Sequence, residues 1–144
     1  MNLMKKTIVV IGGSGGIGGA VSHRFQKYGW NIVLLLRSLT KGSIKDLIVL
    51  PGVKAYLCDP ENQDQVSDLF SSLKKEGVRI DLVFHAAGTF LWDDGFPGVK
   101  MEASEVEQVL TAANLTTKET VISALRQSYG DELSNIKQYL VSSH

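Results

Sequence analysis

The sequence predicts one α/β domain, in which helices cover both faces of a parallel sheet. Short apolar runs rich in valine, isoleucine and leucine recur along the chain, as expected of strands that are buried on both faces. Segments with a helical spacing of apolar residues lie between them, so strands and helices alternate. The first run, residues 7–11, leads into a glycine-rich turn and then a helical pattern that Gly29 ends. These observations predict a Rossmann-like, doubly wound, three-layer α/β/α domain with its strands in the order 3-2-1-4-5.

The same two periodicities predict the remaining elements. Further strands are expected at residues 31–36, 53–58, 80–84 and 136–141. Helices are expected within residues 39–50, where Gly42 should break the pattern, between about residues 60 and 77, and along an apolar stripe at 106–125.

Length and composition indicate a single globular domain spanning residues 1–144. The chain is 44% hydrophobic and 21% charged, and 144 residues suffice for one sizeable core. No apolar run is long enough to cross a membrane, and no signal-peptide core follows the first lysines. Cys58 is the single cysteine, so an internal disulfide is excluded and a cytoplasmic location is expected.

Charge is unevenly placed although the net charge is zero. The first 45 residues carry seven basic residues and no acidic one, whereas the rest of the chain is acidic. This asymmetry favours an anionic ligand, such as a phosphorylated dinucleotide, at the first half of the domain. Nucleic acid is not expected as a partner, because no basic run is interleaved with aromatic residues. The three histidines lack the spacing of metal ligands, so no metal site is expected.

The stretch between residues 11 and 19, Ile-Gly-Gly-Ser-Gly-Gly-Ile-Gly-Gly, is the strongest functional motif. Glycine allows a tight turn with positive φ, and a backbone without Cβ lets a pyrophosphate approach closely. The helix that follows offers unpaired N–H groups and a partial positive charge to that anion. The motif therefore predicts a dinucleotide cofactor.

The glycine spacing also resembles a known family. Gly12-x-x-x-Gly16-x-Gly18 resembles the cofactor loop of the short-chain dehydrogenase/reductase family, and Gly12-x-x-Gly15-x-x-Gly18 resembles its extended, sugar-epimerase-like branch. The resemblance implies that the cofactor is bound by Gly12, Ser14, Gly15, Gly16, Ile17 and Gly18.

Arg37 follows the second predicted strand, at the place where an acid would bind the 2′-hydroxyl of the adenosine ribose. An arginine there can pair with a 2′-phosphate instead. Within the family resemblance, Arg37 is the NADP-selecting arginine, helped by Ser14 and Ser38. We therefore expect NADP(H) rather than NAD(H).

Two later motifs belong to the same resemblance. Asp59 stands where the family commonly places an aspartate against the adenine amino group, although Asp59-Pro60-Glu61 is equally a good helix start with Asp59 as N-cap. Small residues that lie against the ribose and nicotinamide are implied at Ala86, Ala87 and Gly88. His85, which precedes them, is expected to be structural rather than catalytic.

The catalytic set of the family is incomplete. The resemblance implies that Asn114 and Ser143 are catalytic residues, but the expected tyrosine with a lysine four positions later is absent. We therefore expect only the N-terminal, cofactor-binding part of a full-length member, associated with a further part or with a second copy.

The sequence leaves several functions open. The favoured one is an NADP(H)-binding oxidoreductase domain that acts on a carbonyl or hydroxyl group of a small molecule. The alternatives are a non-catalytic dinucleotide-binding or sensing module and a fragment of a nucleotide-sugar epimerase. Arg37 and the 26-residue gap from Gly88 to Asn114 argue against the epimerase.

Overall fold

A computed structural model describes residues 2–12, 16–37, 42–85 and 118–140. Five parallel strands form one sheet in the order β3-β2-β1-β4-β5, which confirms the predicted topology. The strands are β1 (Thr7–Ile11), β2 (Asn31–Leu36), β3 (Val53–Leu57), β4 (Leu82–His85) and β5 (Lys137–Leu140).

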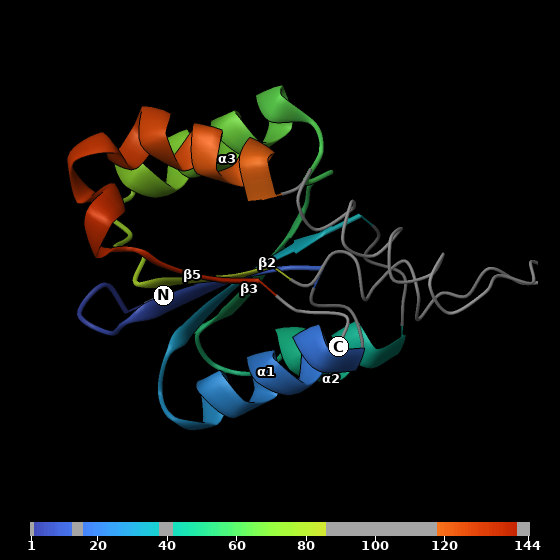
Figure 1. Ribbon diagram of the computed structural model, residues 1–144. Coiled ribbons are helices and arrows are strands. Elements are labelled where there is room, and N and C mark those ends of the chain that lie inside the picture. Colours follow the sequence, from blue (N-terminus) through green and yellow to red (C-terminus); the bar gives the residue numbers. More distant parts are fainter. Residues whose placement is uncertain (1, 13–15, 38–41, 86–117, 141–144) are drawn as a thin grey trace, which may run out of the picture.

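Helices cover both faces of this sheet, so the three-layer prediction is also confirmed (Figure 1). Helices α1 (Gly16–Lys27) and α2 (Gly42–Ile48) lie on one face. Helix α3 (Gln63–Lys75) and the helix at 118–129 lie side by side on the other, and the 3₁₀ helix η1 (Gly130–Asn135) leads into β5. None of the helices in the described ranges is long and apolar enough to cross a bilayer.

The strand periodicity divides the core in two. In β1, Ile8 and Val10 point towards α1 and α2, whereas Val9 and Ile11 point towards α3 and the helix at 118–129. All four side chains are fully buried, as the continuous apolar run predicts for a strand of a parallel sheet.

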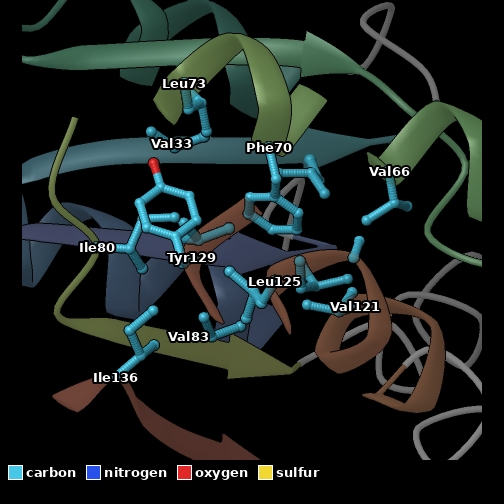
Figure 2. Close-up of a cluster of buried hydrophobic side chains, with 14 of the residues drawn as sticks. Val33, Val66, Phe70, Leu73, Ile80, Val83, Val121, Leu125, Tyr129 and Ile136 are labelled. Atoms are coloured by element: carbon cyan, nitrogen blue, oxygen red, sulfur yellow. The ribbon is translucent and has the colours of Figure 1, made fainter. Parts of the chain in front are cut away.

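The larger core lies between the sheet and the α3 face, where side chains from distant segments meet (Figure 2). Phe70 and Leu73 of α3 pack there against Leu125 and Tyr129. Burying one such side chain contributes roughly 1.5–3 kcal/mol. The Tyr129 hydroxyl donates a hydrogen bond to the Val78 carbonyl at 2.7 Å, so its polar atom is satisfied inside the core.

Element boundaries differ from the sequence prediction in three strands, and β3 ends at Leu57 rather than at Cys58. Ile80 and Ile136 are buried in the core but precede β4 and β5 rather than lying within them. Hydrophobicity alone therefore overestimates the strand length. Asp81 intervenes before β4, where its backbone N–H donates to the Thr7 carbonyl and its carboxylate accepts from the Thr7 N–H, both at 2.9 Å.

Gly42 is the first residue of α2, so the predicted break at this glycine is wrong. The helix is short and ends at Ile48, before the turn that carries Gly52. Gly52 has φ +80°, and its carbonyl accepts a hydrogen bond from the Ile32 N–H at 2.8 Å. This turn therefore needs glycine and aligns the start of β3 with β2.

The single cysteine lies just after β3 and is 3% exposed. The Cys58 N–H donates to the Leu36 carbonyl at 2.8 Å, which extends the pairing of β2 and β3 by one residue. Burial, and secondly the neighbouring Asp59 carboxylate, raise the pKa of the Cys58 thiol to about 11. The thiol is therefore protonated and unreactive in the folded chain.

Candidate functional site

The site is built on the turn from β1 into α1. Gly12 is buried and has φ +80°, which favours glycine strongly. Its N–H donates to the Leu35 carbonyl of β2 at 2.9 Å, so the first residue of the turn is held against the neighbouring strand. The hydrogen bond therefore fixes the point at which the chain turns away from β1, beside the carboxyl end of β2.

Helix α1 begins at Gly16 and has no acidic residue in its first turn, whereas Arg24 and Lys27 lie in its last turn. Helix α1 itself therefore places no carboxylate at the positive end of its dipole. Gly18 is buried, and the Ser22 hydroxyl donates to its carbonyl at 2.8 Å. A twelve-residue helix whose first turn is rich in glycine, preceded by a positive-φ glycine, fits a pyrophosphate group.

Arg37 directly follows β2, at the same carboxyl edge of the sheet. Its guanidinium Nη2 lies 3.6 Å from Glu61 Oε1 and 3.9 Å from Asp59 Oδ1. The three side chains are 32–47% exposed, so the contacts are open to water and salt. The structure thus places two acids beside the predicted phosphate-binding arginine.

The turn after β3 holds these acids in place, and it corrects one prediction. Asn62, not Asp59, is the N-cap of α3, and its side chain accepts from the Gln65 N–H at 3.1 Å. Asp59 Oδ1 instead accepts from the Glu61 N–H at 3.0 Å, and the Asp59 N–H donates to the Gln65 side chain at 2.8 Å. Asp59 stabilises the turn that precedes the helix, because it lies one turn too early to cap it.

His85 ends β4 on the opposite side of β1 and is fully buried. Its Nε2 lies 2.7 Å from Gln138 Oε1 of β5. A carboxamide oxygen only accepts, so Nε2 is the donor and Nδ1 is the bare nitrogen. His85 Nδ1 and Gln138 Nε2 are buried and have no hydrogen-bond partner among the described residues. Burial, and to a lesser degree Lys118, lower the pKa of His85 against the opposing effect of the Gln138 hydrogen bond.

The described residues contain six of the fourteen predicted site residues. They are Gly12 on the β1–α1 turn, Gly16, Ile17 and Gly18 in the first turn of α1, and Arg37 and Asp59 at the carboxyl edge of β2 and β3. The others lie outside the described residues: Ser14, Gly15, Ser38, Ala86, Ala87, Gly88, Asn114 and Ser143.

Sequence reasoning missed Glu61 and Gln138. An acid two residues after Asp59 was the available signal for Glu61, whereas no sequence pattern indicates that Gln138 faces His85. No group of three histidine, cysteine or acidic side chains within the described ranges could hold a metal ion.

The family model described as "short chain dehydrogenase" matches residues 6–131, a stretch that contains the β1–α1 turn, Arg37, Asp59, Glu61 and His85. The chain belongs to the short-chain dehydrogenase family. Among curated proteins it is 31% identical over 87 residues to human dehydrogenase/reductase SDR family member 11, covering 56% of this chain and 33% of that protein. It is 27% identical over 117 residues to the short chain dehydrogenase/reductase dpfgG of Gibberella zeae, covering 80% and 42%.

Solved structures of family members share the fold. An actinorhodin polyketide ketoreductase with NADPH aligns with a TM-score of 0.68 at 19% identity, over 95% of this chain and 53% of that one. A Leptospira borgpetersenii short chain dehydrogenase with bound NAD⁺ aligns with a TM-score of 0.55 at 15% identity, over 85% and 47%. Identities this low show the fold alone. The matched region spans about a third to two fifths of the length of these two curated relatives.

Proposed function

We propose that this short-chain dehydrogenase chain is the NADP(H)-binding part of an oxidoreductase that acts on a carbonyl or hydroxyl substrate. The observation that carries the proposal is the arrangement of Gly12 and the glycine-rich start of α1 beside Arg37, at one edge of a Rossmann-like sheet. Family membership and NADPH in the ketoreductase structure support the cofactor class, whereas NAD⁺ in the Leptospira structure makes Arg37 decisive for the choice.

Each part of the site has a separate task in this proposal. The backbone at Gly12 and the N–H groups of the first turn of α1 bind the pyrophosphate. Arg37 binds the 2′-phosphate, and Asp59 orients the adenine through its carboxylate. The bound cofactor supplies hydride transfer, while the protein holds it in place and orients it.

Ser143 and Asn114 are the proposed catalytic candidates by family resemblance. A serine hydroxyl polarises the substrate oxygen, and an asparagine positions water. Neither group supplies a proton readily near neutral pH. Proton transfer by a general acid or base typically contributes about 10²–10⁴-fold to the rate. No tyrosine in these 144 residues has a lysine four positions later. We therefore propose that catalysis requires residues that this chain does not contain.

The absence from these 144 residues of a tyrosine with a lysine four positions later also favours a second candidate, a non-catalytic dinucleotide-binding or sensing module. The two candidates predict the same cofactor binding and differ in turnover. Their separation therefore needs both a binding and an activity measurement.

Titration of the purified chain with NADPH and NADH, followed by intrinsic or nucleotide fluorescence, tests the proposed cofactor. We expect tighter binding of NADPH, and equal affinities would contradict the assignment to NADP(H). An NADPH-oxidation assay with ketones and aldehydes should give no turnover at rates typical of the family. Robust turnover that survives His85→Ala would show that another residue of this chain is the acid.

A further inference from the structure

Arg37 is outnumbered by carboxylates at the edge where the cofactor's adenosine end is proposed to lie. Glu61 and Asp59 both lie within 4.0 Å of its guanidinium, so the three side chains together carry a net charge of minus one. A 2′-phosphate brings roughly two more negative charges to the same place. Arg37 therefore cannot be treated as a free phosphate-binding cation.

The backbone that carries the two acids is held more firmly than the Arg37 side chain. The Asn62 N–H donates to the Asp59 carbonyl at 3.0 Å, and Asp59 Oδ1 accepts from the Glu61 N–H at 3.0 Å. With the Gln65 contact to the Asp59 N–H, these bonds fix the backbone that carries Glu61. Arg37 is instead a long side chain on a strand end and can change rotamer at low cost.

Glu61 is the nearer acid, and its carboxylate is the less committed one. It lies 3.6 Å from Arg37 Nη2, against 3.9 Å for Asp59. Asp59 Oδ1 also accepts the backbone hydrogen bond of the turn, so removing that carboxylate would disturb the turn. Among the described residues, the Glu61 carboxylate contacts Arg37, and the turn uses the backbone N–H of Glu61 rather than its side chain.

We propose that Glu61 is a specificity-determining residue that opposes the 2′-phosphate of the cofactor. It acts in two ways: it holds Arg37 in the free protein, and it repels the phosphate that replaces it. The inference rests on the proposed dinucleotide binding. As a consequence, Glu61 weakens the binding of NADP(H) but not that of NAD(H), which has no 2′-phosphate, and so reduces the preference for NADP(H) over NAD(H).

The expected gain in NADPH affinity is limited because the contact between Glu61 and Arg37 is exposed to solvent. Ion pairs open to solvent are weak, and salt screens charges at this depth. Loss of the Glu61 charge should therefore tighten NADPH binding by about three- to tenfold at low ionic strength. The gain should shrink when salt is raised.

Glu61→Gln keeps the size of the side chain and removes its charge. Dissociation constants of the full chain for NADPH and NADH are measured by isothermal titration calorimetry at low and high salt. Asp68→Asn is the matched control, because Asp68 is an exposed acid further along α3 and its loss changes the net charge equally. We expect tighter NADPH binding in Glu61→Gln, unchanged NADH binding, and no change of the NADPH/NADH ratio in Asp68→Asn.

A double-mutant cycle with Arg37→Gln separates the two modes of action. If Glu61 acts through Arg37, the gain from Glu61→Gln falls when Arg37 is absent. Circular dichroism verifies that each variant is folded.

The outcomes separate this inference from the proposed function. Binding of neither dinucleotide by the unmodified chain would overturn the proposed function and the inference with it. A chain that binds NADPH with the same affinity before and after Glu61→Gln would overturn the inference alone. An equal gain in Asp68→Asn would also overturn it, since net charge rather than Glu61 would then set the affinity.

Discussion

Two polar clusters lie on the two sides of β1, and they differ in charge and in exposure to solvent. Arg37, Asp59 and Glu61 follow β2 and β3, carry charge and are partly exposed. His85 and Gln138 join β4 to β5, and the His85 side chain is fully buried.

Solvent explains the difference. A charge is stable at an exposed strand end because water solvates it, so Arg37 can exchange one anion for another at little cost to the fold. Burial instead disfavours the charged form of a histidine, which is why the pKa of His85 is lowered rather than raised. We therefore propose that the β2–β3 side binds an anion and that the β4–β5 side stabilises the fold. The following experiments test that assignment.

Gly12→Val should have the largest effect. A β-branched side chain at φ +80° is strained and would occupy the space of the proposed pyrophosphate, so we expect loss of detectable NADPH binding with most helical content retained. Titration and circular dichroism measure the two outcomes.

Gly29→Val is the matched control for this variant. Gly29 has φ +86° with open space around it, at the other end of α1. This variant should share the strain, of about 1–3 kcal/mol, and keep the binding. Loss of the whole fold in Gly12→Val alone would mean that this glycine serves packing rather than a ligand.

Arg37→Asp should weaken NADPH binding by about 1–3 kcal/mol through loss of a charge-assisted pair. Its free energy of unfolding should change by less than about 0.5 kcal/mol, because the residue is at the surface. Titration and urea denaturation measure the two quantities. A large loss of stability would remove the contrast between the two clusters.

His85→Leu should affect the free energy of unfolding more than the binding of NADPH. It leaves the buried Gln138 amide without its partner and should lower the free energy of unfolding by about 1–3 kcal/mol. Adding Gln138→Met should recover part of this loss, because replacing both partners of a buried hydrogen bond can be nearly neutral. Urea denaturation of the two single variants and the double variant gives the coupling energy, and strict additivity would show that the pair is not coupled.

The smallest expected effect concerns pH. An unfolded chain protonates His85 as the pH falls below about 6.5, whereas the folded chain holds it neutral to a lower pH. The unfolded state then binds more protons, so stability falls as the pH drops from about 6.5, by at most about 1.4 kcal/mol per pH unit. The slope between pH 6.5 and 5.5 should be shallower in His85→Leu. An unchanged slope would show that His85 does not contribute to it.

Local patterns predicted the central part of this fold well. The run from Thr7 to Ile11 and the run from Asn31 to Leu36 are strands with the bounds expected, because both are apolar on both faces and end at turn residues. Ile80 and Ile136 were assigned to strands because they are apolar, but their burial comes from the core beneath α3 and the helix at 118–129. Burial and strand pairing have different causes, and a single sequence does not separate them.

The candidate site likewise has one feature that the sequence predicts and one that it does not. The positive φ of Gly12 was predictable, because this backbone conformation restricts the residue type. The contact between Arg37 and Glu61 was not, because it depends on the turn that Asp59 and Gln65 fix between β3 and α3. Contacts between side chains of two strand ends have no signal in local spacing.

Because Cys58 is buried, its reaction with a thiol reagent can report local opening of the fold. At pH 8 a thiol with a pKa of about 11 is ionised in only about one molecule in a thousand, and the sulfur is also shielded from solvent. A thiol reagent therefore labels the chain only when the carboxyl end of β3 separates from β2. Because that end also carries Asp59 and Glu61, the labelling rate measures how often the proposed adenosine-binding edge comes apart, and a ligand bound there should slow it.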